Sequence, residues 1–183
     1  GRAELEAAER AELVLSLPYA REAARVVAGR TGAKLCEVDY PLGLAATERF
    51  LLKAAACAGR RKQAALLAAT ESRAAVRDTQ DHVLRIIAGR DADILQNDPH
   101  LAAGLRELCA ELGLLADGEP PGDGRGRVCF APTAEAFAGK VAHVPAGYPN
   151  YIEHPVVERP FLGYAGFRAL VERVATAILR QEA

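Results

Sequence analysis

The chain has 183 residues, half of them hydrophobic, so it is long enough to bury a core as one domain or two small ones. Its formal net charge is −1, with acidic and basic residues interleaved, which excludes a strongly charged surface for nucleic acid or a membrane. No apolar run is long enough to span a bilayer and the N-terminus lacks a signal pattern, so we expect a cytoplasmic protein.

The first third of the chain has the pattern of a βαβ unit. Residues 12–17 predict a short buried strand that Pro18 ends, and residues 21–28 predict a helix. Residues 34–39 alternate like a second strand. A strand, a helix and a strand joined by short links are typical of a parallel sheet.

A turn with proline and glycine follows this unit. It reads Pro41-Leu42-Gly43, and Thr47 then stands where a helix over residues 48–58 would take its N-cap. Residues 60–88 predict one or two amphipathic helices whose basic side chains form a solvated face or an anion site. Asp78 and His82 would pair if one helix carried both.

A second strand, turn and helix begin at Gly89. Residues 91–100 predict a strand followed by a polar turn, and a helix over residues 101–112 ends at a glycine. Between them, Asn97, Asp98 and the free amides of the helix could receive a small anion or a cofactor carboxylate. Simple helix capping by Asp98, with Pro99 at the first helical position, explains the same residues.

The last third contains two further strands and a long helix. Residues 127–130 and 141–144 predict strands, and residues 132–138 predict a short helix between them. Residues 167–179 predict an amphipathic C-terminal helix. No Gly-x-Gly-x-x-Gly follows any predicted strand, so a dinucleotide site is not supported.

The loop over residues 147–167 is the strongest candidate for a site. It follows a strand, where ligands gather in α/β sheets, and its prolines and glycines restrict the backbone. Its polar side chains are Asn150, Tyr151, Glu153, His154, Glu158 and Arg159. The alternative is a long connection in which His154 is merely solvated.

Several motifs resemble one family. The loop motifs are Gly147-Tyr148-Pro149, then His154, then Gly163-Tyr164-Ala165-Gly166-Phe167. The turn from Pro41 to Thr47 matches a second motif, and Gly89-Arg90, Asp98-Pro99 and Glu111-Leu112-Gly113 match a third region. This pattern resembles the nitrogenase component 1 family, which includes molybdenum-iron protein subunits, cofactor-assembly scaffolds and dark-operative protochlorophyllide and chlorophyllide reductases.

The resemblance and the element order imply the same fold. We expect an α/β protein with two consecutive Rossmann-like units, whose parallel sheets are flanked by helices. We place the first βαβ unit at residues 1–60 and the second unit, with the C-terminal helix, at residues 61–183. The resemblance covers only the C-terminal part of the family's larger subunits.

The resemblance also implies site residues. His154 matches the histidine that ligates the metallocluster in catalytic subunits, which makes it the candidate metal ligand, with Tyr151 and Glu153 beside it. Ser16 stands where those subunits carry a ligating cysteine, and a hydroxyl is a poor ligand for soft iron–sulfur chemistry. Asn97 completes the expected cofactor-binding set.

By resemblance, the chain is an oxidoreductase subunit or fragment in a complex that performs ATP-driven, iron–sulfur-dependent reduction. The implied cofactor is an iron–sulfur or mixed-metal cluster, and a tetrapyrrole is a possible substrate. The implied partners are a subunit of the same family and an ATP-dependent iron–sulfur reductase, in a homo- or hetero-oligomer. The alternative is a non-catalytic carrier or scaffold for cofactor assembly, which Ser16 favours.

Two further expectations concern exposure. The four cysteines include no C-x-x-C pair, so buried small side chains are expected rather than a zinc or redox motif. The aromatic and apolar residues Phe161, Leu162, Tyr164 and Phe167 would form an interface for self-association, or would pack on the chain's own sheet.

Overall fold

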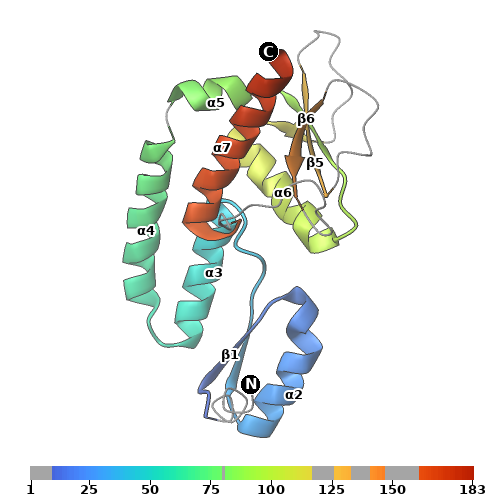
Figure 1. The fold of residues 1–183 in the computed structure, drawn as a ribbon. Coiled ribbons are helices and arrows are strands. Elements are labelled where there is room, and N and C mark those ends of the chain that lie inside the picture. The colour runs from blue at the N-terminus through green and yellow to red at the C-terminus, as the bar shows by residue number, and fades with distance from the viewer. Residues whose placement is uncertain (1–9, 80, 117–125, 133–140, 147–160) are drawn as a thin grey trace.

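The computed structural model describes residues 10–79, 81–116, 126–132, 141–146 and 161–183. Within these residues the chain is an α/β protein in which every strand pairing is parallel (Figure 1). The elements in chain order are β1 (Leu13–Ser16), the 3-10 helix η1 (Pro18–Ala20), α2 (Arg21–Thr31), β2 (Lys34–Glu37), α3 (Leu44–Cys57), α4 (Arg61–Asp78), α5 (Asp81–Ile87), β3 (Asp91–Ile94), α6 (Pro99–Leu112), β4 (Leu115–Ala116), β5 (Arg127–Ala131), β6 (Val141–Pro145) and α7 (Gly163–Glu182).

The strands form two separate sheets. β1 pairs with β2, and the larger sheet has the order β4-β3-β5-β6. From β3 the chain reaches β4 on one side, whereas β5 and β6 extend the sheet on the other side. The order of the strands therefore reverses at β3 and β5, and ligands of open α/β sheets bind at the carboxyl ends of strands at such a point.

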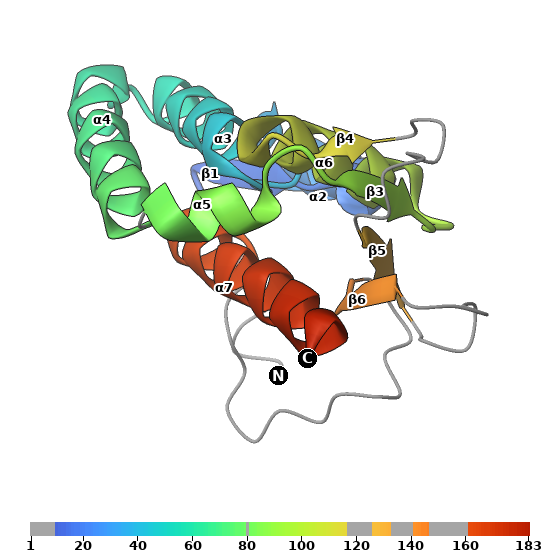
Figure 2. The same ribbon diagram turned by 90° about the horizontal axis from the view of Figure 1, so that it is seen from above.

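One face of the larger sheet carries the main core. Ala92, Ile94, Val128, Phe130 and Val144 alternate along their strands and belong to one buried cluster with apolar side chains of α6 and α7. Figure 2 shows α6 and α7 on the same side of these strands. The sequence pattern of short apolar runs separated by amphipathic helices thus produces the layered fold that was predicted.

The α3–α4 hairpin extends from this core toward the smaller sheet (Figure 1). α3 packs against β2 of the smaller sheet and against α4, α6 and α7, two of which, α6 and α7, cover the larger sheet. The division at residue 60 stays a prediction, although α3, placed in the first unit from the sequence, shares most of its packing with the second. No helix in the described part of the chain is long and apolar enough to cross a bilayer.

Two local predictions are corrected by the structure, and one strand was missed. Thr47 does not cap a helix, because α3 begins three residues earlier and Thr47 is buried inside it. Asp78 and His82 do not share a helix, because α4 ends at Asp78, whose carboxylate pairs with Arg168 at 3.1 Å. The short strand β4 was not predicted, since two residues carry no periodic signal.

The expected aromatic interface is also corrected. Tyr164 and Phe167 are buried on the chain's own core, and Phe161 packs against that core. Leu162 remains exposed. Packing on the chain's own sheet, the alternative stated above, therefore explains the aromatic residues, and self-association needs another surface.

Candidate functional site

Three of the family-like motifs meet at one junction, through Pro41, Gly163 and Glu111. The carbonyl oxygen of Pro41 accepts a hydrogen bond from the Gly163 amide at 2.7 Å and another from the Thr47 hydroxyl at 3.1 Å. Gly163 has a φ of +75°, a backbone conformation that favours glycine. The turn at residue 41 is thereby fixed to the start of α7.

A carboxylate from a third motif joins the same junction. Glu111, near the end of α6, accepts hydrogen bonds from the amides of Leu44 at 2.7 Å and Ala45 at 2.8 Å. These amides belong to the first turn of α3, which has no capping side chain of its own. Gly43 has a φ of +84°, and a Cβ there would lie 2.7 Å from the Glu111 carboxylate.

The Gly-Tyr-x-Gly motif completes the junction. A Cβ on Gly166 would lie 2.6 Å from the backbone oxygen of Phe161, so only glycine allows this approach. The Tyr164 hydroxyl donates to the Ala68 carbonyl of α4 at 3.3 Å. The motifs that carry the resemblance are therefore the contacts that hold α3, α4, α6 and α7 together.

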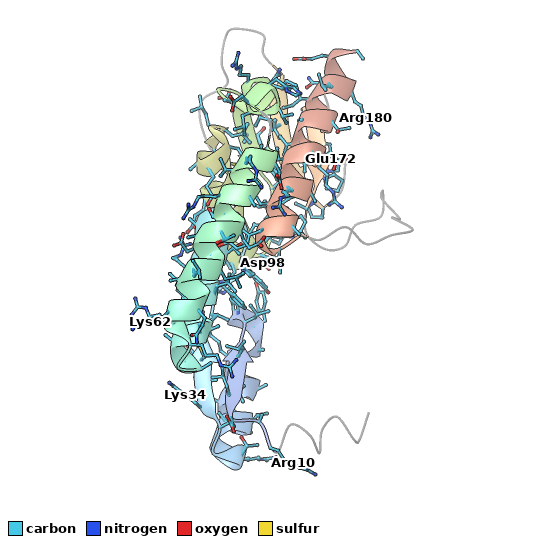
Figure 3. All side chains as sticks on the ribbon, turned by 90° about the vertical axis from the view of Figure 1, so that its left-hand side faces the viewer. Arg10, Lys34, Lys62, Asp98, Glu172 and Arg180 are labelled. Atoms are coloured by element: carbon cyan, nitrogen blue, oxygen red, sulfur yellow. The ribbon has the colours of Figure 1, made fainter. Side chains whose placement is uncertain are left out.

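Tyr19, Asp98 and His100 form a polar cluster beside this junction, just after the ends of β1 and β3. The Tyr19 hydroxyl, from η1 after β1, donates to Asp98 Oδ1 at 2.8 Å. The ring of Tyr19 stacks edge-on against His100, with ring centroids 5.5 Å apart. Figure 3 shows Asp98 at the level where the unit containing β1 meets the larger body. Two distant segments thus contribute one cluster of a phenol, a carboxylate and an imidazole.

Asp98 is the centre of this cluster and caps α6. The same Oδ1 accepts from the amides of His100 at 2.9 Å and Leu101 at 3.1 Å. Burial alone would raise the pKa of Asp98, but hydrogen bonds from Leu101, Tyr19 and His100 outweigh it, so the net pKa is lowered. Asp98 is consequently ionised at neutral pH, and the capping interpretation of Asp98-Pro99 is confirmed.

The two tyrosine side chains near Asp98, those of Tyr19 and Tyr40, stay protonated at neutral pH. The hydrogen bond to Asp98, with a smaller effect of burial, raises the pKa of Tyr19. Burial, and then the charge of Asp98, raises the pKa of Tyr40. Tyr19 is 65% exposed, so its ring presents a flat aromatic surface to a ligand.

We expect Asp98→Ala to lower the free energy of unfolding by about 1 kcal/mol at pH 7, the usual cost of losing an N-cap. Asp98→Asn is the matched control, because asparagine also caps helices but carries no charge. Because the folded pKa of Asp98 lies below the unfolded value, its ionic contribution is complete above about pH 4 and is lost as the pH falls through the folded pKa.

Urea titrations of all three proteins between pH 7 and pH 2 measure this effect. The native chain should lose stability relative to Asp98→Asn as the acid limit is approached, because only the native chain has this carboxylate to protonate. Parallel curves for the two proteins over the whole range would show that the charge of Asp98 contributes nothing.

The structure places two of the five expected site residues. Ser16 ends β1 and is fully buried, and its hydroxyl donates to the Leu17 carbonyl at 3.2 Å. Asn97 is exposed beside Asp98 at the end of β3. Tyr151, Glu153 and His154 lie outside the described residues, so their roles remain predictions.

The described residues do not fit an iron–sulfur cluster. Ser16 offers a hard oxygen that already donates to the backbone, and the polar cluster offers a phenol, a carboxylate and an imidazole. No three His, Cys, Asp or Glu residues within the described ranges are grouped so that they could hold a metal ion. Iron–sulfur clusters are held mainly by thiolates, so cluster ligands would have to come from elsewhere.

Three polar residues that follow the ends of strands were not predicted as site residues. Tyr19 and Tyr40 follow the ends of β1 and β2. Because ligands of α/β sheets bind at the carboxyl ends of strands, an aromatic residue just after a predicted strand could have marked each of them as a candidate site residue. Gln96 donates from Nε2 to the carbonyl of Ala146 at 2.6 Å and joins the ends of β3 and β6. Its role could not be deduced from sequence, because the partner lies 50 residues away.

Comparison with known families decides the relationship. The chain matches the family described as "Nitrogenase component 1 type Oxidoreductase" over residues 2–116. It belongs to this family. The match spans the βαβ unit, the turn at Pro41 and the α6 motif, which are the elements that meet at the junction and the polar cluster. A comparison with curated proteins found no match.

The fold agrees with this assignment. The solved structure "Nitrogenase Cp1 at pH 6.5" is similar to this nitrogenase component 1-type chain with a TM-score of 0.71 and 16% sequence identity. The similarity covers 95% of this chain and 46% of that chain. The chain therefore has the fold of somewhat less than half of the larger protein, and at this identity the likeness concerns the fold alone.

Proposed function

We propose that the chain serves as a subunit, or part of one, in a nitrogenase component 1-type oxidoreductase that performs ATP-driven, iron–sulfur-dependent reduction. The observation that carries the proposal is the family match over residues 2–116, which includes Ser16, Tyr19 and Asp98. Its partners would be a subunit of the same family and an ATP-dependent iron–sulfur reductase. We place this complex in the cytoplasm.

Within such a complex the chain would supply the polar wall of a substrate cleft. Asp98 fixes the phenol of Tyr19, and the exposed ring suits a flat, conjugated substrate such as a tetrapyrrole. The phenol of Tyr40 stays protonated at neutral pH because burial raises its pKa, so it can donate a hydrogen bond.

The cofactor we propose is an iron–sulfur or mixed-metal cluster shared with the rest of the complex. His154 would be its ligand from this chain, with Tyr151 and Glu153 close to the imidazole. A metal-bound histidine normally has a second partner that fixes its tautomer, and these two side chains are the candidates. Ser16 and Asn97 would lie beside the cofactor without ligating iron.

A second candidate function is a non-catalytic carrier or scaffold for cofactor assembly. The observation that favours it is Ser16, whose buried hydroxyl is engaged with its own backbone and so cannot replace a ligating cysteine. A carrier needs to hold its cargo reversibly, and a site with few soft ligands meets that need.

Anaerobic purification from the native source separates the two functions. We expect the isolated chain to be colourless, with iron and acid-labile sulfide far below stoichiometric amounts, since no more than two of its four cysteines lie together and an iron–sulfur cluster normally takes four thiolates. For the oxidoreductase, the purified complex should show iron–sulfur absorbance and consume dithionite electrons only with ATP. His154→Ala in that complex should reduce its iron content.

A carrier would give a different pattern. The colourless chain would take up a reconstituted cluster or a tetrapyrrole when either is offered, and ATP would have no effect on reduction. Stoichiometric iron and sulfide in the isolated chain would contradict our prediction about its ligands. A complex without iron and without ATP-dependent electron uptake would overturn the proposed oxidoreductase function.

A further inference from the structure

Two cysteines from different elements meet where β2 packs on α3. Cys36 of β2 is 2% exposed, and its thiol donates to the Lys53 carbonyl of α3 at 3.7 Å. Cys57 lies one helical turn after Lys53 on the same side of α3. Lys34, two residues before Cys36, donates from Nζ to the Cys57 carbonyl at 3.0 Å. These contacts hold the strand against the last turn of the helix.

The two thiols differ in their surroundings. Burial, and then the hydrogen bond with the Cys57 thiol, raises the pKa of Cys36 to about 11. Cys36 is therefore a protonated, protected thiol at neutral pH. Cys57 is partly exposed, so an oxidant from solution reaches it first. A reactive outer thiol beside a protected inner thiol is the arrangement that a resolving pair requires.

We propose that Cys36 and Cys57 form a reversible disulfide site that reacts with hydrogen peroxide. The Cys57 sulfur attacks one peroxide oxygen, the O–O bond breaks, and a sulfenic acid and one water form. The Cys36 sulfur then attacks the Cys57 sulfur, the S–O bond breaks and a second water leaves. The two thiols lose two electrons and two protons, and the peroxide is reduced to two waters.

This bond would limit how freely the smaller sheet moves relative to the larger one. The segment from residue 38 to residue 43 runs from β2 to α3 and contains Tyr40 and the turn at Pro41. A disulfide between Cys36 and Cys57 would close that segment into a loop and tie the smaller sheet to the α3–α4 hairpin, which extends toward it in Figure 1. Oxidation would thereby restrict movement of Tyr19, from the unit that contains β1 and β2, relative to Asp98.

Peroxide treatment of the native chain followed by mapping without reductant tests the site. Trypsin places Cys36 in the peptide of residues 35–49 and Cys57 in that of residues 54–60. We expect these peptides joined in a monomer, with two of the four cysteines left for alkylation and all four restored by dithiothreitol. Cys129→Ser is the matched control and should leave the link unchanged.

Cys57→Ser should leave Cys36 reduced after the same peroxide treatment, because the protected thiol then has no partner. This variant replaces the less buried cysteine, so it avoids disturbing the core at Cys36. The proposal is overturned if Cys57 proceeds to sulfinic acid while Cys36 stays reduced. It is equally overturned if the peptides are joined only between two chains, or if Cys129 or Cys109 takes part in the bond.

Discussion

Gly166→Ala is expected to lower the free energy of unfolding by about 3 kcal/mol, at the upper end of the cost of overpacking. The new Cβ would lie 2.6 Å from the backbone oxygen of Phe161, and a backbone atom cannot rotate away as a side chain does. The start of α7 or the residues before it would have to move. Because Gly163 bonds to Pro41, the strain would reach α3 as well.

Gly29→Ala provides the matched control. Gly29 lies inside α2, and a Cβ there would have no neighbour within 4 Å. Alanine is favoured over glycine in a helix by about 1 kcal/mol, so this variant should be more stable than the native chain. Urea titration measures both. If Gly166→Ala also stabilises the protein, glycine is not required by the contact with Phe161.

The fold was predictable wherever local sequence determines it. β5 and β6 were found from short apolar runs, and the start of α6 was found because Asp98 and Pro99 form a local cap. The start of α3 was missed because its cap, Glu111, is 67 residues away from Leu44. The local sequence pattern indicated Thr47 as the cap instead. The Thr47 hydroxyl in fact donates to the carbonyls of Gly43 and Pro41, just before α3 begins.

The candidate site was predictable to a smaller extent. Asn97 and Asp98 were placed at the end of a strand by periodicity, which is a local property. Tyr19 was not predicted as a partner of Asp98, because the two are 79 residues apart in the sequence. Ser16 was located correctly at the end of β1, but its burial depends on packing that no single strand pattern contains.

The family motifs were recognised from the sequence, but the contacts that they make were not predicted. Gly163, Gly166 and Pro41 were recognised as turn residues in a family pattern, yet the sequence could not show that Gly163 donates to Pro41. The structure explains why glycine stands at two of these positions: Gly163 has a φ of +75°, and a Cβ on Gly166 would collide with the backbone of Phe161. A motif of this kind is therefore evidence of the fold rather than of a chemical role.

Glu111→Ala is expected to lower the free energy of unfolding by about 2 kcal/mol, the upper value for the loss of a helix cap. One carboxylate accepts from the amides of Leu44 and Ala45, and the N-cap residue of α3, Gly43, supplies no side-chain cap of its own. Hydrogen bonds to an ionised acceptor are stronger than neutral ones, and the first turn of α3 carries no acidic residue that could replace it.

Hydrogen exchange at the Leu44 and Ala45 amides, together with urea titration, measures this directly. Glu107→Ala is the matched control, because Glu107 is also on α6 but pairs at the surface with Arg49, and an exposed ion pair contributes less than about 1 kcal/mol. Glu111→Gln keeps one acceptor oxygen, so it should protect one of the two amides and lose about half as much stability. Equal losses for Glu111→Ala and Glu107→Ala would mean that the carboxylate is a surface charge and that α3 needs no cap from α6.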